Sequence, residues 1–221
     1  MKNVNLSRIR NYMNFRHGFY GEKSFRKAAV MALIIEVDQR PHFVFQERNK
    51  NIRQGGEVSF PGGGFDKEVD FTLLDTAVRE TVEEMGIKKE SIEIWGQLDT
   101  LITQFDMIVE PFVGFSKTKI ENFFPNEDEV SKVFSVPVDF FLENKPEWYD
   151  IVLKSSPIVI DPKTNEQKLI FPAKDLGLPE MYHNEWTTNV RKIPLYKTKD
   201  GVIWGFTAQV IINFVEKIIK F

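Results

Sequence analysis

The chain has 221 residues, of which 42% are hydrophobic and 28% are charged, and its formal net charge is −3. A single domain of this length can bury a substantial core, and a slightly acidic chain lacks the basic patch typical of nucleic-acid binders. The absence of cysteine excludes disulfides, thiolate zinc sites and thiol nucleophiles. No apolar run approaches the roughly 18 residues of a membrane span. We therefore expect a soluble, cytoplasmic protein that binds neither nucleic acid nor membrane.

The hydrophobic pattern predicts alternating strands and helices. Leu6, Ile9 and Met13 have helical spacing and predict a short helix within an N-terminal extension, residues 1–27. A central helix is expected from near Thr72 to Gly86, and an amphipathic helix closes the chain. The predicted strands span residues 28–37, 42–47, 92–98, 106–115 and 132–137. This order predicts an α/β (α+β) fold with a mixed sheet and helices on both of its faces.

We expect one domain over residues 1–221, because no repeat or low-complexity linker divides the chain. Its least regular part is the range 142–193, which we interpret as an elaborated insertion. Residues 154–189 contain several Pro, Lys and Asp residues, which favour a loop or a small hairpin. A lid and a plain surface insertion are both compatible with this segment.

The central helix carries the most informative pattern. Glu80, Glu83 and Glu84 stand at positions i, i+3 and i+4, which places them on one helical face. Like charges at this spacing repel one another unless a cation lies between them. Mg²⁺ prefers oxygen ligands and pairs a few carboxylates with water and substrate phosphates. The alternative is an ordinary solvated acidic face.

The residues around these acids resemble a known motif. The run from Arg79 to Ile87, Arg-Glu-Thr-Val-Glu-Glu-Met-Gly-Ile, resembles the second half of the Nudix hydrolase box. The first half departs from that box, since Phe65 stands where a Gly is usual and Phe71 stands where a Glu is usual. Three acids remain alternatives for the missing partner of Arg79: Glu68, Asp70 and Asp75.

A longer first half is typical of one branch of this family, the coenzyme A pyrophosphatases. The resemblance covers about residues 28 to 220. Arg48 and Arg53 resemble part of the branch's lead-in to the box, with a spacing one residue short before Gly56. The other matching segments are residues 56–63, 76–80, 110–115, 126–138 and 203–208.

The resemblance implies a Nudix-type α/β/α sandwich and an enzyme. Its reaction would be metal-dependent hydrolysis of the pyrophosphate bond of coenzyme A or its derivatives, giving 3',5'-ADP and 4'-phosphopantetheine. Glu80, Glu83 and Glu84 would hold Mg²⁺ or Mn²⁺ together with the backbone carbonyl of Gly64. We expect Glu83 to act as the base or to orient the attacking water.

Other residues receive supporting roles. Arg79 is expected to lie off the side of the helix that carries the carboxylates, and to pair with an acid that fixes the turn. Gly62 and Gly63 let the backbone approach a metal or phosphate closely. Arg48 and Arg53 are candidates for binding substrate phosphates, with plain solvated arginines as the alternative.

Two other functions remain open. One keeps the chemistry and changes the small-molecule substrate to ADP-ribose or another nucleoside diphosphate derivative. The other is a catalytically silent Nudix module that binds a nucleotide. The acidic cluster 126–129 either supplies a further catalytic acid or forms an ordinary turn. The oligomeric state is also open, with a homodimer among the alternatives.

Overall fold

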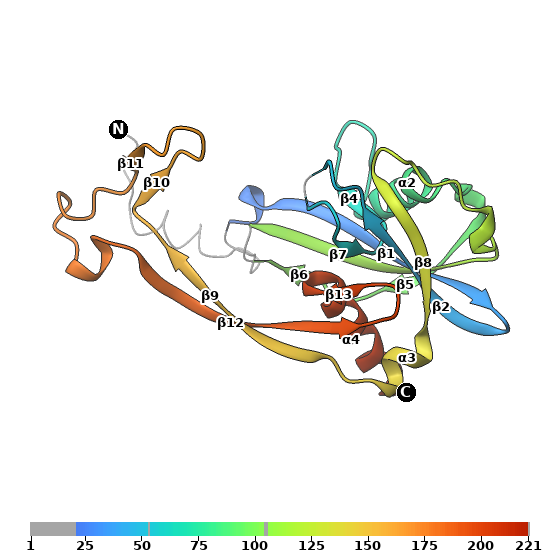
Figure 1. The fold of residues 1–221 in the computed structure, drawn as a ribbon. Coiled ribbons are helices and arrows are strands. Elements are labelled where there is room, and N and C mark those ends of the chain that lie inside the picture. The colour runs from blue at the N-terminus through green and yellow to red at the C-terminus, as the bar shows by residue number, and fades with distance from the viewer. Residues whose placement is uncertain (1–20, 53, 104–105, 221) are drawn as a thin grey trace, which may run out of the picture.

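A computed structural model describes residues 21–220 apart from 53 and 104–105 (Figure 1). The helix predicted at residues 6–13 and the side chain of Arg53 therefore lie outside the described residues. No helix in the described ranges is long and apolar enough to cross a membrane.

An eight-stranded mixed sheet forms the centre of the molecule (Figure 1). Its central strand, β1 (Arg26–Val37), is antiparallel to β2 (Arg40–Arg48) and parallel to β7 (Met107–Ser116). The other strands are β3 (Val58–Ser59), β4 (Gly62–Gly64), β5 (Ile92–Gln97), β6 (Leu101–Ile102) and β8 (Val130–Pro137). The five strands predicted from the pattern are confirmed, whereas β3, β4 and β6 are too short to carry a pattern.

Helices cover both faces of this sheet. Alternate residues of β1 point to opposite sides, so Met31 and Leu33 belong to the core under α2 (Leu73–Met85), while Ala32 and Ile34 belong to the other core. That second core lies under α3 (Val138–Glu143) and α4 (Gly205–Ile219). Figure 1 shows α2 and α4 on opposite sides of the sheet. The predicted α/β/α arrangement with a mixed sheet is confirmed.

The core under α4 contains a group of phenylalanine rings in mutual contact. The ring of Phe43 lies 4.8 Å from that of Phe214 and 5.4 Å from that of Phe60, both edge-on. Phe60 in turn stacks on Phe45 at 4.7 Å. Such aromatic contacts add to the stabilisation from burial alone. They also hold Phe60, the residue that leads into the glycine strand β4.

The two ends of α2 are fixed as the sequence predicts. Thr72 accepts a hydrogen bond from the amide of Asp75, whose carboxylate accepts one from the amide of Thr72. At the other end Gly86 is left-handed, with φ 62°. A Cβ at Gly86 would stand 1.9 Å from the carbonyl oxygen of Phe124, so no other residue fits there.

We expect Thr72→Ala to lower the free energy of unfolding by about 1 kcal/mol, because it removes the side-chain half of this cap. Urea unfolding followed by circular dichroism measures the change. Thr72→Ser keeps the hydroxyl and serves as the control. An equal loss in both variants would contradict a role for the hydroxyl.

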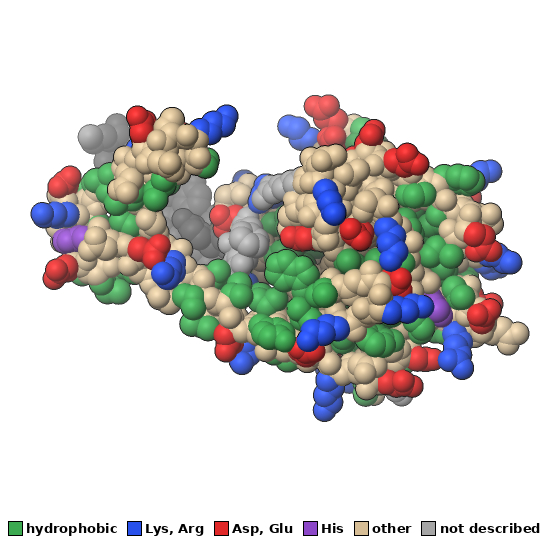
Figure 2. Space-filling model, viewed as in Figure 1, with side chains coloured by type: hydrophobic (Ala, Val, Ile, Leu, Met, Phe, Trp, Pro, Cys, Tyr) green, Lys and Arg blue, Asp and Glu red, His purple; other side chains and the backbone are tan. Residues whose placement is uncertain are grey.

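A long antiparallel arm extends from the body (Figure 1). It pairs β9 (Glu147–Ser155) with β12 (Trp186–Lys197), which also pairs with β13 (Val202–Trp204). Its tip holds a hairpin of β10 (Ile158–Ile160) and β11 (Gln167–Leu169). Hydrophobic side chains are exposed along the arm (Figure 2). The expectation of a loop or small hairpin over 154–189 understates this structure, and the insertion status of 142–193 stays a prediction.

Short 3₁₀ helices complete the chain: η1 (Glu22–Ser24), η2 (Lys89–Ser91), η3 (Ile120–Asn122) and η4 (Glu180–Tyr182). Two of them, η1 and η2, lie next to β1 and α2, which position the candidate site. η1 precedes β1, and η2 follows the end of α2.

Candidate functional site

The acidic side of α2 lies against the glycine strand β4. The amide of Gly62 donates a hydrogen bond of 2.8 Å to Oε2 of Glu84. One residue further along, a Cβ at Gly63 would stand 2.4 Å from Oε1 of Glu80. The strand itself pairs with the start of β1, so the sheet fixes its position. The backbone of Gly62 and Gly63 therefore lies close to carboxylates of α2, and its approach to a metal or phosphate stays a prediction.

Glu84 is the most deeply buried of the three predicted acids, with 2% of its surface exposed. Burial raises the pKa of Glu84 to about 7, against the opposing hydrogen bonds from Gln46 and Gly62. The neighbouring charge of Glu80 raises it further, and Arg48 lowers it. Nη1 of Arg48 lies 3.8 Å from Oε1 of Glu84. Arg48 is thus beside the metal-site candidate, where its charge is partly matched by a carboxylate.

Gln46 is a site residue for which the sequence pattern gave no role. Its side chain is fully buried, bonds to Glu84, and donates from Nε2 to the hydroxyl of Ser59 at 3.4 Å. Within the described residues its Oε1 has no hydrogen-bond partner. A polar residue at a buried position of a strand was the available signal, because buried polar groups need partners.

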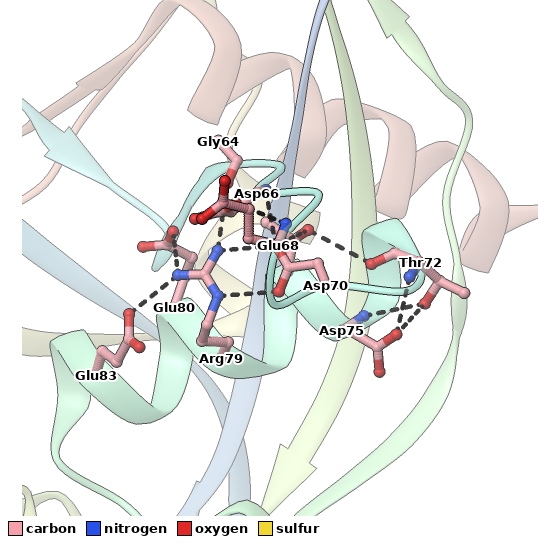
Figure 3. Close-up of polar contacts among 10 residues, drawn as sticks. Gly64, Asp66, Glu68, Asp70, Thr72, Asp75, Arg79, Glu80 and Glu83 are labelled. Atoms are coloured by element: carbon pink, nitrogen blue, oxygen red, sulfur yellow. Dashed lines mark hydrogen bonds and ion pairs between the residues drawn. The ribbon is translucent and has the colours of Figure 1, made fainter.

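The guanidinium of Arg79 donates hydrogen bonds to four other residues of the site (Figure 3). Nε and Nη2 each lie 2.9 Å from an oxygen of Asp70, a bidentate pair. Nη1 donates to Glu80 at 2.8 Å and to Glu83 at 3.1 Å. Nη2 also donates to the carbonyl of Gly64 at 3.3 Å. The expectation that Arg79 lies away from the carboxylates is wrong, because its long side chain reaches Glu80 and shares a helical face with Glu83 at i+4.

Asp70 is the acid that pairs with Arg79, of the three alternatives left by the sequence. Its carboxylate also accepts hydrogen bonds from Thr76 and from the amide of Asp66. These bonds, led by those from Arg79, hold the pKa of Asp70 well below its usual range. Asp75 is engaged in the helix cap, so it does not serve as the partner of Arg79.

The acidic loop 126–129 lies beside the end of α2. The amide of Asn126 donates to the carbonyl of Glu84 at 3.2 Å, and the charge of Glu129 contributes to a raised pKa of Glu80. Burial is the main cause of that rise, and the hydrogen bond from Arg79 opposes it. The structure therefore places the loop next to the site, although its role as a source of a catalytic acid stays a prediction.

Comparison with known proteins identifies the family. The model of the NUDIX domain matches residues 25–155, which include β4, Asp70, Arg79 and the three glutamates. The chain belongs to the Nudix domain family.

Relatives of this Nudix domain match over part of their length. Nudix hydrolase 3 of Caenorhabditis elegans is 41% identical over 115 residues, 50% of this chain and 47% of that protein. Peroxisomal coenzyme A diphosphatase NUDT7 of Mus musculus is 36% identical over 124 residues, 56% of this chain and 52% of that protein. The chain thus spans about half the length of these relatives. A crystal structure of a C. elegans Ap4A hydrolase complex is 18% identical, with a TM-score of 0.44, over 52% of this chain and 83% of that one.

The donor atoms of this Nudix site suit Mg²⁺ or Mn²⁺, since they are carboxylate and carbonyl oxygens. The described residues nevertheless contain no group of three His, Asp or Glu side chains placed to hold a metal ion. In the structure Arg79 contacts Glu80, Glu83 and the carbonyl of Gly64. The chemistry of these oxygen donors fits the ion, and their role as its ligands stays a prediction.

We expect Gly63→Ala to lower metal-dependent turnover about a hundredfold, because the new Cβ displaces the carboxylate of Glu80. The fold should tolerate it, since the displaced atoms end a flexible side chain. Gly62→Ala is the contrasting variant: Gly62 has φ 156°, and its Cβ would stand 2.4 Å from the backbone oxygen of Ala29. It should lower the free energy of unfolding by about 2 kcal/mol or more. Turnover assays and urea unfolding are measured for both variants. Equal losses in the free energy of unfolding would contradict the expected difference between Gly62→Ala and Gly63→Ala.

The raised pKa of Glu84 predicts how stability depends on pH. The folded metal-free protein keeps a proton on Glu84 that the unfolded chain releases at its ordinary pKa near 4.5. The associated stability is therefore present below about pH 4.5 and is lost as the pH rises to about 7. We expect a loss of up to about 3 kcal/mol across this window, and a flatter profile for Glu84→Gln. Urea unfolding in chelator at several pH values measures it; parallel profiles would contradict the assignment.

Proposed function

We propose that this chain hydrolyses the diphosphate linkage of coenzyme A or its derivatives, with Mg²⁺ or Mn²⁺ as cofactor. The carrying observation is the Asp70–Arg79 pair, which holds the acidic face of α2 against the glycine strand. Similarity to the mouse coenzyme A diphosphatase supports the choice of substrate. The position of Arg48 beside Glu84 also supports it, since Arg48 lies in the segment that resembles the lead-in of that branch.

In this proposal Glu80, Glu83 and Glu84 hold the metal with the carbonyl of Gly64. The ion, when bound, neutralises diphosphate charge and lowers the pKa of a bound water. Glu84 is fixed for this role by the amide of Gly62, whereas Glu80 and Glu83 must leave Arg79. Asp70 keeps the released guanidinium in place, so the rearrangement involves side chains alone.

The reaction adds a water oxygen to one phosphorus and breaks the bridging P–O bond. For coenzyme A the products are 3',5'-ADP and 4'-phosphopantetheine. Glu83 is the proposed base that accepts the proton of the attacking water. Its side chain is 54% exposed, compared with 16% for Glu80 and 3% for Glu84, so it can pass that proton to solvent.

A catalytically silent nucleotide-binding module is the second candidate, and one observation favours it. Arg79 forms ion pairs with Glu80 and Glu83, so these two carboxylates have a cationic partner within the chain. In that case a nucleotide would bind without hydrolysis and without a requirement for a divalent metal.

A product assay separates these functions. Coenzyme A, ADP-ribose and dinucleotides are incubated in parallel with Mg²⁺, Mn²⁺ or chelator, and the products are separated by chromatography. Metal-dependent release of 3',5'-ADP, fastest from coenzyme A, is the expected result. Faster cleavage of ADP-ribose would show that coenzyme A is not the preferred substrate, while the proposed diphosphate hydrolysis would stand. No turnover with either metal would favour the silent module.

A further inference from the structure

A cavity of about 710 Å³ opens next to the glycine strand. Gly63 lies against the carboxylate of Glu80, and the next residue, Gly64, lines the cavity. A substrate whose diphosphate lies at Glu80 is therefore one residue away from this space. The volume falls within the range of small-molecule sites, roughly 300–1,000 Å³. The other lining residues are Glu22, Lys23, Phe25, Lys27, Phe65, Asp66 and Lys67.

Lysines give the cavity its cationic character. Lys27 is paired with Glu22 at 3.1 Å, so its charge is matched. Lys23 and Lys67, by contrast, form no ion pair with any residue in the described ranges. Asp66, the other acid of the lining, accepts a hydrogen bond at Oδ1 from the amide of Glu68 within its own turn. The lining thus carries three lysines and two acids, and the ammonium groups of Lys23 and Lys67 are the two without an ion pair in the described ranges.

The walls of the cavity are tied to the catalytic residues. Lys67 lies in the turn between Asp66 and Asp70, and Asp70 is bound by Arg79. On the other wall the carbonyl of Lys27 accepts a hydrogen bond of 2.9 Å from the amide of Phe65. These hydrogen bonds fix the position of the cavity relative to α2. The half-buried rings of Phe25 and Phe65 add apolar surface to the same wall.

Arg48 is less suited to a distant phosphate. Its Nη1 lies 3.8 Å from Oε1 of Glu84, and burial raises the pKa of Glu57 while the charge of Arg48 opposes that rise. Arg48 therefore faces carboxylates at the metal-site candidate. Among the residues that line the cavity, Lys23 and Lys67 are the cations that form no ion pair within the described part of the chain.

We infer that this cavity binds a second phosphate of the substrate, a monoester separate from the cleaved diphosphate, through Lys23 and Lys67. The inference rests on the proposed function and narrows it to nucleoside diphosphate derivatives that carry a further phosphate. Coenzyme A has such a group at its 3' position, and ADP-ribose has none. Ammonium groups are strong donors to phosphate oxygens, and both lysines line the same cavity.

The test uses the double variant Lys23→Ala/Lys67→Ala of the full chain. The matched control is Lys117→Ala/Lys145→Ala, which removes two exposed lysines elsewhere. Lys117 follows Ser116, which pairs with Ile35 near the far end of β1 from the cavity. The kcat/KM of each protein is measured for coenzyme A and for 3'-dephospho-coenzyme A. Calorimetry then measures the binding of 3',5'-ADP, 5'-AMP and inorganic phosphate.

The expected result is that wild type and control prefer coenzyme A, and that the cavity variant loses this preference about tenfold or more. The same variant should bind 3',5'-ADP about tenfold more weakly and should no longer distinguish it from 5'-AMP. An unchanged preference for both substrate and product would overturn the cavity assignment while leaving hydrolysis intact. Equal loss of 3',5'-ADP and 5'-AMP affinity would also overturn it, as would binding of inorganic phosphate alone. Failure of wild type to cleave coenzyme A would instead reject the proposed function, and the binding measurements still decide the cavity.

Discussion

Replacing Glu84 with glutamine should lower the kcat/KM for metal-dependent hydrolysis of coenzyme A about a thousandfold. Glu84 is the only predicted ligand in this site that Arg79 does not contact; its carboxylate is held by the amide of Gly62 and by Gln46. It is therefore the carboxylate positioned for an ion before any side chain moves. Glutamine keeps the shape and can accept from the amide of Gly62, but it lacks the negative charge.

The same substitution should not weaken the metal-free fold at pH 8. A buried carboxylate with a raised pKa is destabilising once ionised, so a neutral amide is at least as stable there. Added Mn²⁺ should raise the melting temperature of wild type and leave that of Glu84→Gln unchanged, because an ion stabilises only the state that binds it. Glu90→Gln, at an exposed acid of η2, is the control. Unchanged turnover with an unchanged metal response would reject Glu84 as a ligand.

The local sequence was sufficient to predict α2. Its cap, apolar face, acidic face and terminal glycine all depend on residues within about four positions of one another, so periodicity and capping rules determine them. The structure confirms the expected bounds near Thr72 and Gly86, with a capping box at Thr72 and a left-handed Gly86. The central strands could be predicted equally well from the sequence. β1 is buried on both faces, and its sequence is therefore almost continuously apolar.

The contacts of Arg79 needed the tertiary structure. Asp70 lies nine residues earlier, and the turn after β4 decides that it, rather than Glu68 or Asp75, meets the guanidinium. The burial of Glu84 likewise depends on Gly62, which comes from a different element. Helical periodicity places Glu80, Glu83 and Glu84 on one face, yet only Glu84 is deeply buried. The sequence pattern predicts which face of the helix a side chain lies on, but it does not predict how deeply that side chain is buried.

The arm was missed for a related reason. Strand β9 exposes apolar residues on both faces, including Trp148, Tyr149 and Val152, so it shows no clean alternation. Their pairing joins residues about 30 to 50 positions apart. Local turn signals in residues 154–189 describe only the tip. The long-range pairing that creates the arm has no local signature.

Asp70→Asn should lower the free energy of unfolding by about 3 kcal/mol, the largest stability effect expected at the site. The side chain of Asp70 is 2% exposed and accepts bonds from both Nε and Nη2 of Arg79, from Thr76 and from the amide of Asp66. An amide group turns one accepting oxygen into a donor that faces other donors. The charge of Arg79 then loses its principal partner inside the site.

The loss should also appear in turnover and in acid stability. Without Asp70, Arg79 is no longer held on its far side when Glu80 and Glu83 turn to the metal, so kcat should fall with the fold still intact. Because the folded pKa of Asp70 is lowered, its stabilisation is present above its unfolded value of 3.8 and is lost as the pH falls below it. Wild type should therefore lose stability more steeply than Asp70→Asn in strong acid.

A double-mutant cycle with Arg79→Met and Asp70→Asn isolates the pair. We expect a coupling energy of about 2 kcal/mol from urea unfolding, since each single variant leaves the other group without its partner. Asp75→Asn is the matched control: it alters an aspartate of the same segment that is engaged only in the cap, and it should cost about 1 kcal/mol or less. If Asp70→Asn and Asp75→Asn proved equally mild, the Asp70–Arg79 pair would not be what holds the acidic helix against the glycine strand. The glutamates would then owe their placement to the packing of α2 on β1 alone.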